Sequence, residues 1–255
     1  MVGRPTCGPE RALETARRLT APERTRRFYK LADIVPEAGG LALRLDGRRA
    51  ITPGKKPIAV PNRRLADAIA AEWNAQADTI DPGSMPVTRL ANTAIDGVAL
   101  RHAAVRDEIA AYSGTDLLCY RASEPEGLVA RQNAAWNPIL AWAEQRFGVR
   151  FMLAEGIVHV AQSEEGLTAL RAELEAYDDP FRLAGLHLAT TLTGSALIAL
   201  ALAAGVLGAE DAWGAAHVDE DWNISQWGED REAAERRARR FADFRAAALA
   251  LAQGE

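Results

Sequence analysis

A turn rich in proline and glycine, within residues 72–96, constrains the fold of this chain more than any other stretch. Residues 81–84 read Asp-Pro-Gly-Ser and end the helix before them, because proline and glycine interrupt regular structure. Met85-Pro86 then holds the backbone extended, since a residue that precedes proline disfavours the helical region. A second helical pattern begins directly afterwards, so two helices must meet here at a defined angle.

Several side chains of this stretch are expected to act as a structural joint between two parts of the chain. Trp73 follows Leu65 and Ile69 at helical spacing, so we place it on the apolar side of the first helix, where a charged replacement would cost several kcal/mol. The residues expected to fix the joint are Trp73, Met85, Pro86, Arg89 and Asp96.

Residues 27–61 have the pattern of short strands. Leu41, Leu43 and Leu45 alternate with smaller or polar residues, which is the period of a half-buried strand. Asp46-Gly47 follows at once and is a strong signal for a β-hairpin. A turn at 53–54 and a short apolar run at 57–60 complete this region, and Asn62 is a good N-cap for the first helix.

Beyond Met85 the sequence is mainly helical. Apolar residues from Ile95 to Tyr112 recur in steps of three and four and predict one continuous helix. Trp136 marks another helix, in which Pro138 is expected only near the first turn. The uncharged run 183–208 predicts one long buried helix, whose strongly apolar part is shorter than the roughly 20 residues that span a bilayer.

The fold class expected is α+β, with a small β-rich N-terminal domain followed by a larger, mainly α-helical C-terminal domain. We expect a flexible basic arm at 1–23, a β-rich domain at 24–82 that ends in a helix, and a helical domain at 83–255 with a small β-hairpin near 149–160.

Charge bears on the partners and on the compartment. The formal net charge of the chain is -5, which argues against nucleic acid as a partner. The first thirty residues nonetheless carry eight Arg or Lys against three Glu, and those acids favour a solvated arm over a mitochondrial presequence. Two cysteines, Cys7 and Cys119, form no disulfide framework. We therefore prefer the bacterial cytoplasm, with the mitochondrial matrix as the alternative, and expect no membrane insertion.

Motifs that resemble known chemical sites fail on their spacing. Residues 47–56 lack the four-residue gap and the Ser or Thr of a phosphate loop. Asp219, Asp221 and Asn223 imitate a calcium loop, but Ile224 stands where glycine is needed. The histidines show no ligand spacing, and residues 193–196 lack a hydrolase elbow. We expect no catalytic residue, cofactor or metal, and hence no enzyme.

One segment keeps a functional interpretation as a contact surface for a partner protein. Trp222 is favoured as a core residue, whereas Gly228 inside a helical pattern indicates close approach by some other group. Tryptophan is enriched where binding energy is concentrated. The residues proposed to bind a partner are Gln226, Trp227, Glu229 and Asp230.

Three motifs of the opening stretch carry a family resemblance: Glu72-Trp73-x-x-Gln76, Met85-Pro86-x-x-Arg89-Leu90 and Thr93-Ala94-Ile95-Asp96. With Asp116-Leu117-Leu118 and Trp227-Gly228 further on, the sequence from about 24 to about 250 resembles the assembly chaperones of the F1 ATP synthase alpha subunit, found in mitochondria and alpha-proteobacteria. After Glu229 the chain departs from the family pattern.

The resemblance implies a chaperone without ATPase activity that binds the free alpha subunit of F1 and shields its beta-facing surface until the beta subunit arrives. We expect it to act as a monomer. Acids at Asp219–Asp221, Glu229 and Asp230 would then complement basic groups on the client. Two alternatives remain: a small-molecule-binding enzyme of unknown reaction, and a structural subunit of a larger complex.

Overall fold

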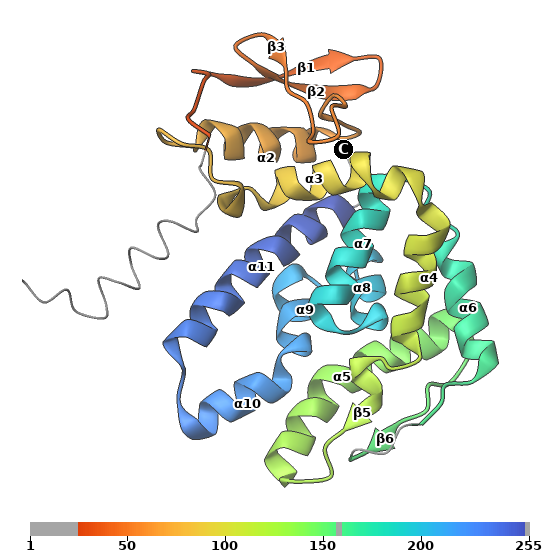
Figure 1. Cartoon of the computed structure of the whole chain (residues 1–255). Helices are drawn as coiled ribbons and strands as arrows, with labels where there is room; N and C mark the ends of the chain where they lie inside the picture. Colours follow the sequence, from red (N-terminus) through yellow and green to blue (C-terminus); the bar gives the residue numbers. More distant parts are fainter. Residues whose placement is uncertain (1–24, 157–159, 253–255) are drawn as a thin grey trace, which may run out of the picture.

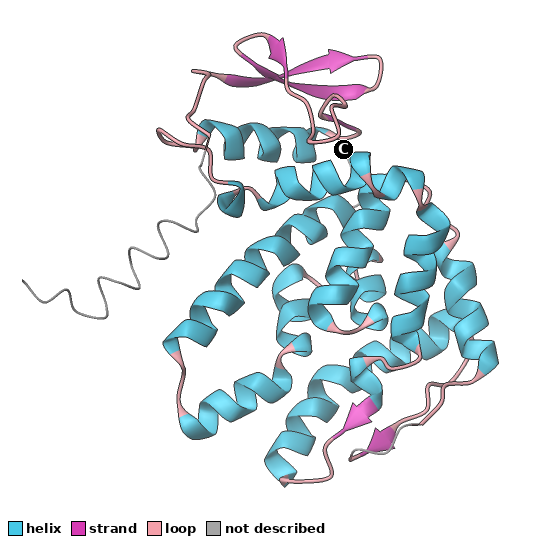
Figure 2. Cartoon of the chain, viewed as in Figure 1, coloured by secondary structure: helices cyan, strands magenta, loops and turns pink. Residues whose placement is uncertain are grey.

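A four-stranded sheet lies at one end of the molecule and most of the helices form the rest, in the α+β arrangement that the sequence predicts (Figure 1, Figure 2). The computed structural model describes residues 25–156 and 160–252. The predicted basic arm at 1–23 lies outside these ranges. The boundary predicted between residues 82 and 83 falls within a short 3-10 helix (Pro82–Ser84), and it stays a prediction.

The sheet is built around its second strand. β1 pairs antiparallel with β2, so that Ala32 faces Leu45 and Glu37 faces Gly40. β3 and β4 both pair antiparallel with β2, at different residues of that strand. The bounds of these strands are β1 (Ala32–Glu37), β2 (Gly40–Leu45), β3 (Arg48–Arg49) and β4 (Ala59–Val60).

The predicted hairpin at Asp46-Gly47 is confirmed. Both residues have positive φ, 49° and 77°, which suits the tight turn between β2 and β3. Helix α2 (Arg63–Asn74) covers the sheet and starts where the sequence predicts, because the Asn62 side chain accepts a hydrogen bond from the backbone N–H of Leu65 at 2.9 Å.

The remaining helices form the larger part of the molecule, with α7 packed along α11 and against α3, α4 and α8 (Figure 1). Every residue of α8 except Leu202 is buried. None of the helices in the described ranges is long and apolar enough to cross a membrane. Their bounds are α3 (Pro86–Asp96), α4 (His102–Ser113), α5 (Glu126–Phe147), α6 (Glu164–Leu174), α7 (Pro180–Thr193), α8 (Ala196–Ala203), α9 (Ala209–Ala216), α10 (Val218–Trp227) and α11 (Arg231–Leu251).

Two predicted helices are broken, and one is longer than predicted. The continuous helix through Tyr112 is wrong, because the chain leaves α3 at Gly97 and makes a 3-10 turn before α4. The long apolar helix ends at Gly194, whose φ of 69° is left-handed. Pro138 lies in the middle of α5, where the buried Trp136 and Ile139 hold the helix despite the missing donor.

The hairpin predicted near 149–160 does not form in the described part of that stretch. β6 (Ala154–Glu155) instead pairs in parallel with β5 (Tyr120–Arg121), which follows the short 3-10 helix Leu117–Cys119. Residues 157–159 of the predicted hairpin lie outside the described ranges.

A fully buried carboxylate, Asp116, ties this 3-10 helix to α8. It accepts hydrogen bonds from the backbone N–H groups of Leu118 and Leu197, each at 3.1 Å, and from the Ser195 hydroxyl. Burial outweighs these bonds and raises the pKa of Asp116 from 3.8 to about 6. Asp116 therefore holds the start of α8 through its hydrogen bonds, whereas the burial of its negative charge destabilises the folded state.

Replacing Asp116 with Asn is expected to change how stability depends on pH. The folded pKa lies above the unfolded one, so the contribution of the carboxyl to stability is full below about pH 4 and is lost as the pH rises through about 6. Urea unfolding should show that the free energy of unfolding of the wild type falls between pH 4 and pH 7, relative to that of Asp116→Asn, by on the order of 3 kcal/mol. A stability difference between the two proteins that stays constant over this range would contradict this account.

Candidate functional site

Helix α10 ends in a tryptophan that projects into solvent. The side chain of Trp227 is 87% exposed, the largest value among the exposed large apolar residues in the described ranges. Gly228 follows with φ 87° and ψ 170°, a conformation that is essentially restricted to glycine. Asp230 then caps α11 by accepting a hydrogen bond from the backbone N–H of Ala233 at 2.8 Å. The turn therefore presents Trp227 between two helix ends.

Gly228 follows the last residue of α10 and does not lie inside a helix, although the sequence pattern predicts that it does. No heavy atom lies within 4 Å of the position that its Cβ would take, so nothing approaches it closely in this structure. The backbone angle, and not a close contact, requires glycine here.

The exposed tryptophan borders a hollow of about 390 Å³ between α10 and α11. Trp227, Glu229 and Asp230 line it, together with the apolar side chain of Ile224. Gln226, the fourth predicted residue, is exposed and donates to the Ser225 hydroxyl at 3.2 Å, but it does not line the hollow. Three of the four predicted residues are thus brought together.

Most acids near the turn are held by partners within the chain. Asp219 accepts a hydrogen bond at 2.7 Å from the buried Gln132 of α5, and Asp221 is paired with Arg237 of α11. The hydrogen bond that Arg237 donates to Asp221 is the main reason that the pKa of Arg237 is raised. Glu229, by contrast, is exposed and has no ion pair or hydrogen bond from its side chain within the described part of the chain.

Trp222 serves to attach α10 to α5. It is half-buried, and the guanidinium of Arg131 lies 5.0 Å from its ring centroid. A Cβ at Gly127 of α5 would lie only 2.6 Å from the Trp222 ring, so the two helices approach closely there. Trp222 therefore packs inward and Trp227 outward.

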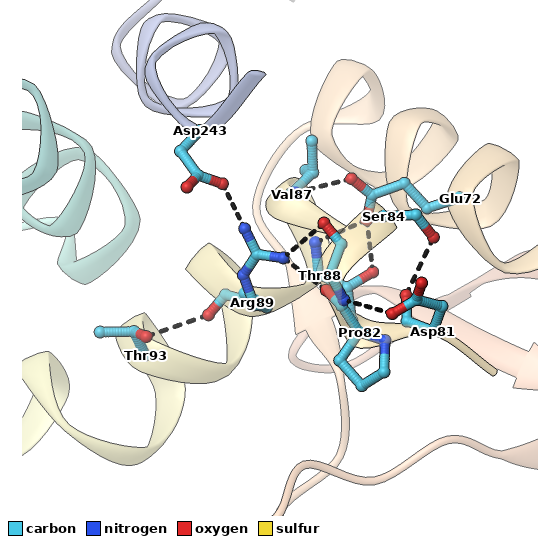
Figure 3. A network of polar contacts seen from close by, with 10 residues as sticks. Glu72, Asp81, Pro82, Ser84, Val87, Thr88, Arg89, Thr93 and Asp243 are labelled. Carbon is cyan, nitrogen blue, oxygen red and sulfur yellow. Dashed lines mark hydrogen bonds and ion pairs between the residues drawn. The ribbon is translucent and has the colours of Figure 1, made fainter. Parts of the chain in front are cut away.

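The stretch at 72–96 is organised by Glu72, as Figure 3 shows. The Glu72 carboxylate accepts hydrogen bonds from the backbone N–H groups of Val87 and Thr88, at 2.7 and 2.8 Å, and from the Thr88 hydroxyl at 2.7 Å. It thereby caps the start of α3, which Met85 does not cap through its side chain. Burial raises the pKa of Glu72, and these hydrogen bonds act in the opposite direction.

Gln76 holds the turn itself and is 6% exposed. Its side-chain oxygen accepts from the backbone N–H of Asp81 at 2.7 Å, and its amide donates to the Glu72 carbonyl and the Ser84 hydroxyl. The residues of the Glu-Trp-x-x-Gln motif therefore have structural tasks within this junction.

The residues proposed as a joint lie between the two ends of the molecule. Arg89 of α3 donates to the carbonyls of Pro82 and Gly83 and pairs with Asp243 of α11 (Figure 3). Asp96, at the other end of α3, accepts from the Thr52 hydroxyl and the backbone N–H of Gly54, both at 2.8 Å.

The other three joint residues have packing and backbone roles. Met85 is 2% exposed, and Pro86 is the first residue of α3. Trp73 is half-buried, and its backbone carbonyl accepts a hydrogen bond at 2.7 Å from the hydroxyl of Tyr29. That these residues set the angle between two domains stays a prediction.

Sequence reasoning missed the role of Glu72, although a signal was present. Pro86 begins α3, and neither it nor Met85 supplies a side-chain acceptor for the exposed N–H groups of the first turn. A carboxylate from elsewhere in the chain was therefore needed. In the described ranges, no group of His, Cys, Asp and Glu is arranged to hold a metal ion.

Comparison with known proteins identifies the family. The family model for the ATP12 chaperone protein matches residues 26–144. The crystal structure of Atp12 from Paracoccus denitrificans superimposes with a TM-score of 0.81 at 40% identity, over 89% of this chain and 97% of that chain. The chain belongs to the ATP12 chaperone family.

Two further relatives support this membership. The Atu1473 protein of Agrobacterium tumefaciens is 48% identical, with a TM-score of 0.85 over 96% of this chain and 91% of that one. The mitochondrial protein atp12 of Schizosaccharomyces pombe is 24% identical over 215 residues, which cover 80% of this chain and 74% of the relative. As an ATP12 chaperone, the protein acts in assembly of the F1 sector of ATP synthase.

Proposed function

We propose that this ATP12 chaperone binds the free alpha subunit of F1 through the α10–α11 turn and shields its beta-facing surface until the beta subunit arrives. The observation that carries the proposal is Trp227, which is 87% exposed and borders a hollow with no described segment of the chain covering it. An exposed tryptophan costs free energy in water and is typical of residues that anchor a protein interface.

The charges around the anchor suit a transient complex. Glu229 is the acid of this turn that is left available, since Asp219, Asp221 and Asp230 serve neighbours within the chain. One exposed carboxylate beside an apolar anchor speeds encounter with a basic client surface without strengthening the final complex greatly. A chaperone that the beta subunit displaces needs fast association together with limited affinity.

Glu229→Lys is expected to slow association with the alpha subunit several-fold at low salt, and less at high salt, because exposed charges are screened. The measurement is the association rate by stopped flow at two salt concentrations. Glu165→Lys, an equal charge change at an exposed position on α6, serves as the control. Equal rates for wild type and Glu229→Lys would remove Glu229 from the interface.

The proposal includes a monomer that acts in the bacterial cytoplasm without membrane insertion, catalysis, cofactor or metal. Its test is isolation of the tagged chain from its native cell under mild conditions. Co-isolated free alpha subunit supports the proposal. Co-isolation of intact ATP synthase would favour a structural subunit, and a small molecule that raises the melting temperature by binding would favour an enzyme.

A further inference from the structure

A hollow of about 540 Å³ is lined by residues of the four-stranded sheet and its surroundings. This sheet lies at the end of the molecule away from α10 (Figure 1). Residues from three separate segments line the hollow: the chain before β1, the β3 region and the end of α2. The side chains that matter here are Phe28, Tyr29, Arg48, Arg49, Ile51 and Trp73.

Much of the lining of the hollow is apolar. Phe28 and Ile51 are 68% and 58% exposed, which places two large apolar side chains in water. Tyr29, only 5% exposed, packs against Trp73 with ring centroids 5.5 Å apart. The indole N–H of Trp73 is shielded from solvent and has no hydrogen-bond acceptor within the described residues. Exposed apolar side chains beside an unpaired indole N–H are unfavourable in a free protein, and a bound partner would cover them.

The charged groups around the hollow are mainly cationic. Arg48 is exposed and makes no ion pair with any described residue, whereas Arg49 pairs with Glu37 at 2.8 Å and its side chain is still 59% exposed. Asp46 also lines the hollow and keeps its negative charge, because the hydrogen bonds that it accepts from the backbone N–H groups of Leu31 and Lys30, at 2.9 and 3.0 Å, lower its pKa. Two arginines against one aspartate leave the lining of the hollow with an excess of one positive charge, on a chain whose net charge is -5.

We propose that this hollow is a second client-docking site, which binds an acidic segment of the alpha subunit that carries an apolar side chain. The inference rests on the proposed function and adds a contact at the opposite end of the chaperone. The apolar side chain would enter between Phe28 and Ile51, and the carboxylates would meet Arg48 and Arg49.

Charge distinguishes this occupant from one within the chain. Residues 1–24 carry five Arg against three Glu, so the positively charged lining of the hollow would disfavour the chain's own N-terminal segment. Two sites at opposite ends also suit a shield, because two weak contacts hold a large surface and can be released one after the other.

The test is titration of purified alpha subunit with the full chain. Arg48→Glu and Ile51→Asn are each expected to raise the Kd about 10-fold. Arg64→Glu, the same charge change at an exposed position of α2, should bind as wild type does. Benzoylphenylalanine in place of Phe28 should crosslink to an acidic segment of the alpha subunit.

Each other outcome overturns the inference. Unchanged affinity in Arg48→Glu and Ile51→Asn, with weakened binding in Trp227→Ala, overturns this second site and leaves the proposed function standing. Crosslinking of position 28 to the chain's own residues 1–24 assigns the hollow to the arm. A wild-type dimer that Arg48→Glu dissociates assigns it to a second copy. No binding by the wild type removes the proposed function together with this site.

Discussion

Replacing Trp227 with alanine is expected to weaken binding of the alpha subunit by about 30-fold or more, the range of an interface hot spot. The side chain is 87% exposed in the free chain, so its removal takes away contact area with the client and leaves the core unchanged. The measurement is the Kd by titration calorimetry with purified alpha subunit. The free energy of unfolding should change by less than about 0.5 kcal/mol.

The matched control for this variant is Leu100→Ala. Leu100 is 71% exposed on the 3-10 helix between α3 and α4, and it loses apolar area without lying near α10. It should bind the alpha subunit as the wild type does. If Trp227→Ala and Leu100→Ala bind equally well, the α10–α11 turn is not the anchor of the interface.

Replacing Glu72 with alanine is expected to lower the free energy of unfolding by about 3 kcal/mol. The change removes the acceptor of two backbone N–H groups and one hydroxyl at the start of α3, in a partly buried place where water replaces it poorly. Glu72→Gln should cost less, because it keeps one acceptor oxygen and removes a charge that burial disfavours. Chemical denaturation of the three proteins at pH 7 measures both differences.

Asp67→Ala on the same helix is the control for Glu72. Asp67 is exposed and pairs with Arg63 one turn away at 2.8 Å, an arrangement worth only about 0.3–0.5 kcal/mol. A loss in Glu72→Ala no larger than that in Asp67→Ala would show that the carboxylate does not hold the junction. Folded Glu72→Ala protein should still bind the alpha subunit, since Glu72 lies away from α10.

Local signals predicted the parts of the fold that depend on neighbouring residues. The hairpin at Asp46-Gly47 and the cap at Asn62 each need only a few adjacent residues, and both are present. Helix ends that depend on tertiary packing were missed. Gly97 interrupts an otherwise regular apolar pattern, and Pro138 is tolerated inside α5 because its neighbours are buried.

The candidate site was only partly predictable, because some of its contacts depend on tertiary packing. Trp222 and Trp227 are five residues apart, so about 100° per residue places them on different faces of one helix. That spacing alone indicates that one can pack inward while the other faces out. It does not reveal that Asp219 is bound to Gln132, 87 residues earlier, or that Glu72 caps a helix 15 residues later. Such pairings depend on how the elements pack.

A displacement experiment tests most directly whether the chain forms a transient complex with the alpha subunit. Purified chain is mixed with free alpha subunit, the complex is isolated by size exclusion, and beta subunit is then added. The account predicts a one-to-one complex of chain and alpha subunit from which beta subunit releases the chain. Absence of that complex, or retention of the chain in the assembled alpha–beta product, would contradict it.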